Sequence, residues 1–138
     1  MGKKPAIMEK FIPGFIINRF QIALQREVHY LVDNDYMTPS EIDEAARWGL
    51  ALRMMVLGIL QRMDYGGIDI SVKNLNNPNT QPVPADYKPK KMLELYEKGN
   101  LGVKTGKGWY DYSGKSQAEW NRERDLGLIK LLKALNLK

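Results

Sequence analysis

The 138-residue chain has no cysteine, a single histidine and no long apolar run. The lack of cysteine excludes disulfide frameworks, cysteine-ligated zinc and thiol nucleophiles. With His29 as the only imidazole, the chain has no histidine-rich metal site and little capacity for general acid–base chemistry near neutral pH. The longest apolar stretch, residues 54–60, falls short of the roughly 20 residues that cross a bilayer. We therefore expect a cytoplasmic chain that is not a self-sufficient catalyst.

The charge of the chain is only mildly basic. A net charge of +5 arises from 21 basic and 16 acidic residues, which alternate along the sequence instead of forming blocks. Neither a helix-turn-helix pattern nor an aromatic stacking pattern accompanies the lysines, so we expect no nucleic-acid binding and no membrane binding. The hydrophobic content of 43% is ordinary for one globular domain, here taken as residues 1–138.

The pattern of apolar residues is helical through most of the chain. Residues 15–32 carry an apolar stripe at helical spacing after Pro13-Gly14. Thr38-Pro39-Ser40-Glu41 has the residues of a capping box, which predicts a second helix that ends near Trp48, before Gly49. Residues 50–63 are almost all apolar and predict a helix covered on most sides, with Gly58 as a point of close packing.

The second half of the chain continues the helical pattern with two interruptions. Helices are predicted over 68–75, 92–98 and about 115–137, and four prolines predict a surface loop over 76–89. Residues 101–112 predict a glycine-rich turn followed by a short extended stretch. Together these elements predict an all-α domain of about six helices.

Three residues or segments are candidates for chemistry on sequence grounds. The segment 102–108 has three glycines and two lysines, but its spacing does not match a phosphate-binding loop and no strand precedes it, so we interpret it as a structural turn. Arg53 interrupts an apolar segment, so it must reach solvent, pair with Asp64, Asp69 or Glu41, or bind an anion. His29 has no neighbouring carboxylate or nucleophile in the local sequence and is interpreted as structural or solvated.

Three segments in fixed order carry a resemblance to a known family. They are Pro13-Gly14-Phe15-Ile16-Ile17-Asn18-Arg19-Phe20, Glu41-Ile42-Asp43-Glu44-Ala45 with Gly49, and Leu101-Gly102-Val103-Lys104-Thr105-Gly106-Lys107-Gly108-Trp109-Tyr110-Asp111-Tyr112. Over residues 10–113 the chain resembles the C-terminal domain of 3-hydroxyacyl-CoA dehydrogenases. The resemblance implies the helical fold shared with the C-terminal domain of 6-phosphogluconate dehydrogenase.

The resemblance also implies which parts of the active site each of the two domains contributes. In that family an N-terminal Rossmann domain binds NAD and supplies the catalytic histidine and its glutamate, whereas the helical domain closes the substrate cleft and forms the dimer interface. This chain lacks the first half, so we expect it to be inactive alone, to bind no cofactor, and to pair with its own Rossmann domain and a second copy. Asn18 matches the family asparagine that orients the substrate. Some relatives are fused to an enoyl-CoA hydratase, a further partner implied by analogy.

The chain departs from the family between Gly49 and Asp69. Common members have a Pro-Met-Gly-Pro stretch there, whereas this sequence has a longer apolar segment with Arg53 and Met54, which we expect to line the substrate site. That segment looks closer to the lambda-crystallin and gulonate dehydrogenase branch. The leading hypothesis is oxidation of 3-hydroxyacyl-CoA to 3-oxoacyl-CoA in fatty acid β-oxidation. The alternatives are a dehydrogenase of free hydroxy acids and a non-catalytic helical interaction module.

Overall fold

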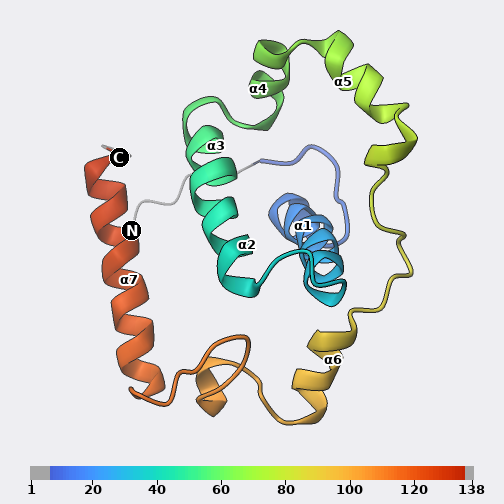
Figure 1. Cartoon of the computed structure of the whole chain (residues 1–138). Coiled ribbons are helices and arrows are strands. Elements are labelled where there is room, and N and C mark those ends of the chain that lie inside the picture. The colour runs from blue at the N-terminus through green and yellow to red at the C-terminus, as the bar shows by residue number, and fades with distance from the viewer. Residues whose placement is uncertain (1–6, 136–138) are drawn as a thin grey trace. The chain divides into compact units, whose positions relative to one another are not determined.

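Seven α-helices make up most of residues 7–135, which are the residues that the computed structural model describes (Figure 1). They are α1 (Phe15–Asp33), α2 (Pro39–Ala45), α3 (Leu52–Leu57), α4 (Ile59–Gly66), α5 (Ile68–Leu75), α6 (Lys90–Glu97) and α7 (Gln117–Ala134). A π-helix, η1 (Ala46–Ala51), and two 3₁₀ turns, η2 (Pro78–Thr80) and η3 (Val103–Thr105), complete the set. The described residues form no β-strand, only isolated bridges, so the all-α prediction is confirmed.

The chain divides into two compact units. Among the described residues, the first holds residues 7–17 and 92–135, and the second holds residues 18–91. No helix of the described part is long and apolar enough to cross a bilayer.

Helix α1 begins and ends where the sequence predicts. Gly14 and Phe15 have left-handed φ angles of 85° and 54°, which turn the chain into the helix. At the other end Asp35, with φ of 57°, stops it, and the Asn34 side chain donates to the Tyr30 carbonyl at 2.8 Å. Short polar residues tolerate this conformation better than other non-glycine residues because their side chains bond the local backbone.

Helix α2 begins with the predicted capping box. The Glu41 amide donates to Thr38 Oγ1, and the Glu41 carboxylate accepts from the Thr38 amide at 2.8 Å, with Pro39 in the first turn. The helix does not end at Gly49, so that prediction is wrong. Instead the chain continues through η1 into α3 as one helical rod from residue 39 to residue 57. Gly49 lies inside the π-helix, whose backbone continues through it.

Gly58 has a different role from the one predicted. With φ of 71° and ψ of −171° it ends α3 and starts α4, so residues 50–63 are two helices and not one. A Cβ at this position would meet no atom within 4 Å. The glycine is therefore required by its backbone angles and not by close packing.

The proline-rich segment 76–89 lies along the second half of α1 and is here called the strap. The Val83 amide donates to Glu27 Oε1 at 2.7 Å, and the Tyr87 ring meets Tyr30 edge-on at 5.6 Å. Residues 78–80 form η2, and the remainder is loop, as predicted. The strap is thus held to α1 by hydrogen bonds from the Val83 amide and from the Tyr87 hydroxyl, which donates to Asp33.

In the first unit, α7 is attached to the glycine-rich segment by one aromatic pair. Trp120 Nε1 donates to the Tyr112 carbonyl at 2.9 Å, and the two rings pack at 5.6 Å and 87°. Lys115 lies 4.7 Å over the Trp120 ring and pairs with Glu123. The helix begins at a second capping box formed by Ser116 and Glu119. Residues 136–138, within the predicted last helix, lie outside the described residues.

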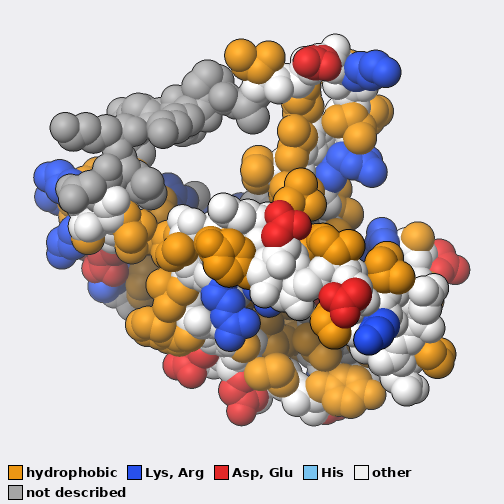
Figure 2. Space-filling model, turned by 90° about the horizontal axis from the view of Figure 1, so that it is seen from above, with side chains coloured by type: hydrophobic (Ala, Val, Ile, Leu, Met, Phe, Trp, Pro, Cys, Tyr) orange, Lys and Arg blue, Asp and Glu red, His pale blue; other side chains and the backbone are white. Residues whose placement is uncertain are grey.

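Few hydrophobic side chains are buried within the described chain. Val32, Ile42 and Val83 are the buried ones, all in the second unit. Most of the apolar residues of 50–63 are exposed, with Val56 at 80% and Leu60 at 76%, so the predicted covered helix is not covered by residues 7–135. The space-filling view shows apolar side chains spread over the drawn face (Figure 2).

Candidate functional site

Asn18 lies in the first turn of α1 and is exposed. The left-handed angles at Gly14 and Phe15 set the direction in which this turn leaves the preceding arm. A side-chain amide donates and accepts hydrogen bonds without titrating, so it can hold a substrate oxygen at any pH at which the protein is folded. The orienting role of Asn18 stays a prediction.

Arg53 and Met54 lie side by side in the first turn of α3 but differ in exposure. Arg53 is exposed, whereas Met54 is half-buried. Among residues 7–135, Arg53 forms no ion pair and no hydrogen bond, so the predicted alternative of pairing with Asp64, Asp69 or Glu41 is wrong. The segment 45–63 contains three arginines and no acidic residue, although Glu44 and Asp64 flank it directly. The Glu41 carboxylate is instead held by Thr38.

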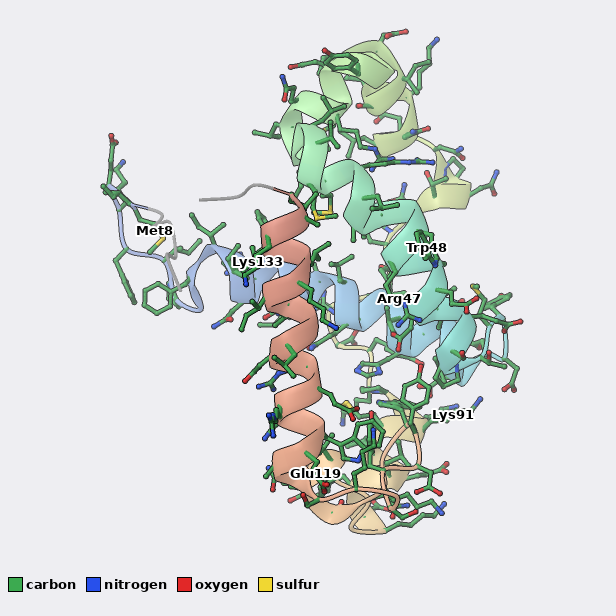
Figure 3. All side chains as sticks on the ribbon, turned by 90° about the vertical axis from the view of Figure 1, so that its left-hand side faces the viewer. Met8, Arg47, Trp48, Lys91, Glu119 and Lys133 are labelled. Carbon is green, nitrogen blue, oxygen red and sulfur yellow. The ribbon has the colours of Figure 1, made fainter. Side chains whose placement is uncertain are left out.

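The most connected polar group of the second unit is the Asp33 carboxylate at the end of α1. It accepts hydrogen bonds from the Tyr87 hydroxyl at 2.5 Å and from the amides of Lys90 at 2.7 Å and Lys91 at 2.9 Å. These amides belong to the first turn of α6, so Asp33 caps that helix. The Lys91 ammonium, labelled in Figure 3, returns to the Val32 carbonyl and to Asp35, so it caps α1.

These contacts shift two pKa values. Partial desolvation works to raise the pKa of Asp33, but the hydrogen bonds from Tyr87 and from the Lys91 and Lys90 amides outweigh it, and the pKa is lowered. The same hydrogen bond from its hydroxyl to Asp33 raises the pKa of Tyr87 to about 12. This cluster was not predictable from local sequence, because Asp33 and Lys91 are far apart in the chain and no local pattern pairs them.

His29 lies one turn before Asp33 on α1 and is half-buried. Desolvation lowers its pKa, and the nearby Asp33 charge opposes the shift only in part. The expectation that no carboxylate lies near His29 is therefore wrong, because Asp33 is one turn away on the same helix. The structural role of His29 stays a prediction.

The glycine-rich segment folds onto itself. The amides of Gly102, Gly106 and Gly108 donate to carbonyls of the same segment, those of Lys107, Val103 and Tyr110. A Cβ at Gly108 would lie 2.8 Å from the Gly102 Cα, so this close approach requires glycine. The three glycine amides are thus already bonded within the segment, which agrees with its interpretation as a structural turn.

Two cavities open within the units. One of about 380 Å³ lies between α6 and the glycine-rich segment, with Tyr96, Trp109 and Lys104 in its walls. The other, of about 640 Å³, lies between α4, α5 and the strap, with Met63, Asn74 and Gln81 in its walls. Their polar groups include no cluster of three metal-ligating side chains, nor does any other part of residues 7–135. Neither cavity contains Asn18 or Arg53.

Comparison with known proteins places these features in a family. The family profile described as "3-hydroxyacyl-CoA dehydrogenase, C-terminal domain" matches residues 14–112. The solved structure of a 5-formyl-3-hydroxy-2-methylpyridine 4-carboxylic acid 5-dehydrogenase, described as an NAD⁺-dependent dismutase, superposes with a TM-score of 0.81. Its identity is 27%, and the match covers 92% of this chain and 41% of that one.

Several curated proteins match over most of this chain. The 5-dehydrogenase of that pyridine carboxylate from Mesorhizobium japonicum is 27% identical over 98% of this chain and 44% of its own length. An L-carnitine dehydrogenase from Streptomyces griseus is 32% identical, and the match covers 96% of this chain and 39% of the length of that enzyme. A probable 3-hydroxybutyryl-CoA dehydrogenase from Bacillus subtilis is 32% identical, and the match covers 84% of this chain and 39% of the length of that protein.

The shared region is a defined part of these enzymes. The chain spans about two-fifths of the length of the curated relatives it matches. The profile match begins at Gly14, just before α1, and ends at Tyr112, where α7 attaches. Since that match covers well over half of the chain and the fold is the expected helical one, the chain belongs to the 3-hydroxyacyl-CoA dehydrogenase family and represents its C-terminal domain.

Proposed function

We propose that this chain is the substrate-side domain of an NAD-dependent dehydrogenase that oxidises a 3-hydroxyl group to a ketone. The observation that carries the proposal is Asn18, exposed in the opening turn of α1 at the position of the family asparagine. As the family resemblance implies, the dinucleotide and the catalytic histidine would belong to a Rossmann domain outside this chain. The chain alone is therefore expected to be inactive.

In this reaction the chain contributes position and not proton transfer. The hydride acceptor would be supplied by NAD held in the Rossmann domain. The Asn18 amide can donate to the substrate oxygen as the carbon is oxidised and can accept from a neighbouring donor, which fixes the reacting geometry. Such a role needs no ionisable group, in agreement with a half-buried His29 of lowered pKa and no further histidine.

Two substrate classes remain as candidates. The leading one is 3-hydroxyacyl-CoA, supported by similarity to 3-hydroxybutyryl-CoA dehydrogenases, and it would place the protein in fatty acid β-oxidation. The second is a free hydroxy acid, supported by the unpaired Arg53 and by similarity to L-carnitine dehydrogenases. A purely non-catalytic module would need only the exposed apolar faces and would leave Asn18 without a role.

The test is the substitution Asn18→Ala in the dehydrogenase that contains this chain. We expect kcat to fall about 100-fold, the typical cost of losing one oriented hydrogen-bond donor in a reacting site, with NAD affinity unchanged. Gln25→Ala is the matched control, because Gln25 is another exposed amide on α1. An unchanged kcat in the Asn18 variant would remove this residue from the mechanism.

A further inference from the structure

The inference concerns the cavity of about 380 Å³ in the first unit, between α6 and the glycine-rich segment. Its volume lies at the lower end of the roughly 300–1,000 Å³ that small-molecule sites occupy. Three aromatic side chains, those of Tyr96, Trp109 and Tyr112, form part of its walls, and leucine, methionine and glycine residues form most of the remainder. Aromatic walls of this kind suit a planar ring, because aromatic groups stack on one another or meet edge to face.

Two polar side chains also line the cavity, and neither has a partner within residues 7–135. Lys104 forms no ion pair and no hydrogen bond there, and the side-chain amide of Asn100 forms no hydrogen bond. Lys115 of the same unit, by contrast, pairs with Glu123. Among the described residues, none of the side chains that line the cavity is acidic. An unpaired ammonium beside aromatic walls therefore favours a ligand with negative charge, and the amide offers a second donor.

The wall that carries Lys104 is held in place by hydrogen bonds of its own segment. Thr105 Oγ1 lies 3.1 Å from the carbonyl oxygens of both Gly102 and Lys107, and it accepts from the Leu101 amide at 2.8 Å. The Gly102 amide donates to the Lys107 carbonyl at 2.7 Å. A wall that is already ordered loses little conformational freedom when a ligand binds, which favours affinity.

We propose that this cavity is a binding site for a planar aromatic ring that carries an anionic group. The ring packs against Tyr96 and Trp109, and the Lys104 ammonium donates to the anion. The proposal goes beyond the proposed function and does not rest on it, because the walls contain neither Asn18 nor Arg53. An aromatic carboxylate and a nucleoside monophosphate both have this chemistry, and the experiments below distinguish them.

The first test separates the contribution of the ring from that of the charge. 2-Naphthoate has both, 2-naphthamide has the ring alone, and cyclohexanecarboxylate has the charge alone. With ¹⁵N-labelled tryptophan in the full chain, 2-naphthoate should shift the indole NMR signal of Trp109 and leave that of Trp48, which lies in the second unit, unchanged. We expect each incomplete compound to bind about tenfold more weakly. Equal affinity for 2-naphthoate and 2-naphthamide, or equal shifts of the two indole signals, would overturn the site.

The second test locates the site by substitution in the complete dehydrogenase. In calorimetric titrations, Lys104→Met should raise the Kd for 2-naphthoate about tenfold, the typical cost of losing a hydrogen bond to a charged group. Lys107→Met is the matched control, because Lys107 is an exposed lysine of the same segment that does not line the cavity. Arg53→Met should also leave this Kd unchanged, which separates the result from the proposed function.

Two outcomes of this titration would contradict the proposal. Equal losses in Lys104→Met and Lys107→Met would show a general effect of charge and no defined site. Binding to the full chain that disappears in the complete dehydrogenase would also overturn the site, because another part of the enzyme then fills the cavity.

The source of the ring is decided by comparing AMP with 2-naphthoate in the same titrations. A lower Kd for AMP that rises in Lys104→Met identifies a nucleoside monophosphate, and a lower Kd for 2-naphthoate identifies an aromatic carboxylate. Either result supports the site. Failure of both compounds to bind at millimolar concentration would overturn it.

Discussion

At the scale of single residues, Asp33 joins two helices that lie far apart in the sequence. Its carboxylate caps the N-terminus of α6, while Lys91 caps the C-terminus of α1. Each side chain thereby satisfies backbone groups that its partner helix cannot satisfy internally. Since α1 carries Asn18 in its first turn and ends at this pair of caps, the pair also fixes the helix on which the candidate site residue stands.

Replacing Asp33 with Asn should release the Tyr87 hydroxyl from its charged acceptor. We expect the Tyr87 pKa to fall from about 12 toward its ordinary value of 10.0, measured by NMR titration of ring-labelled tyrosine. Asp35→Asn is the control, because Asp35 pairs with Lys91 and not with Tyr87. A Tyr87 pKa that stays near 12 in Asp33→Asn would contradict the hydrogen bond.

The same carboxylate makes stability depend on pH. Because the folded state lowers the pKa of Asp33, its contribution is complete above the ordinary value of 3.8 and is lost as pH falls through the lowered value. Asp33→Asn should therefore flatten the acid limb of the unfolding midpoint against pH.

Residue-level expectations differ in how far the sequence could support them. The capping box at Thr38 and Glu41 was predictable and is confirmed, because all its contacts lie within four residues. The lack of an ion-pair partner for Arg53 among the described residues was not predictable, because the exposure of its side chain depends on the phase of the helix over several turns. Burial of the apolar neighbours suggested a paired arginine, whereas the structure shows an unpaired one.

At the scale of elements, Gly49 lies inside the helical rod of residues 39–57 and Gly58 ends it, and the two glycines differ in whether their backbone angles require glycine. Gly49 lies inside η1, has no unusual φ, and leaves room for a Cβ. Gly58 has φ of 71° and ψ of −171°, a region essentially restricted to glycine. The two positions therefore form a matched pair that separates backbone strain from packing.

We expect Gly58→Ala to lower the free energy of unfolding by about 1–3 kcal/mol through backbone strain. Gly49→Ala should raise it by about 0.5–1 kcal/mol, because alanine restricts the unfolded chain more than glycine does. Urea unfolding with matched slopes measures both changes. Similar effects of the two substitutions would show that the angles at Gly58 do not matter.

The positions of the elements were largely predictable, and their junctions were not. Helix α1, the strap and α5 lie where apolar spacing and prolines predict them. The π-helix was missed because a glycine in an apolar run indicates a helix end more often than a wider turn. The division at Gly58 was missed for the related reason that sequence does not distinguish a glycine needed for space from one needed for its angles.

At the scale of the whole molecule, apolar surface is the dominant feature. The described residues bury three hydrophobic side chains, while large apolar groups on α3, α4 and α7 remain exposed. Exposed apolar area on this scale marks an interaction surface. We propose that a second copy and the Rossmann domain cover these faces in the complete enzyme.

Self-association is the direct expectation of that proposal. Sedimentation velocity over the micromolar range should show a concentration-dependent dimer, and Val56→Glu on α3 should weaken it at least tenfold. Ser40→Glu is the control, because Ser40 is exposed on α2 near a helix start where a negative charge is tolerated. A strict monomer in the unsubstituted chain would contradict the dimer.

The small number of buried side chains has a calorimetric consequence. Heat capacity rises on unfolding because apolar groups become hydrated, by about 12–15 cal/mol/K per residue in ordinary domains. A chain whose apolar groups already contact water in the folded state exposes little additional apolar surface when it unfolds. Scanning calorimetry of the dilute monomer should thus give a heat-capacity change of unfolding per residue well below that range. The ordinary value should return once association has buried Val56, Leu60 and their neighbours.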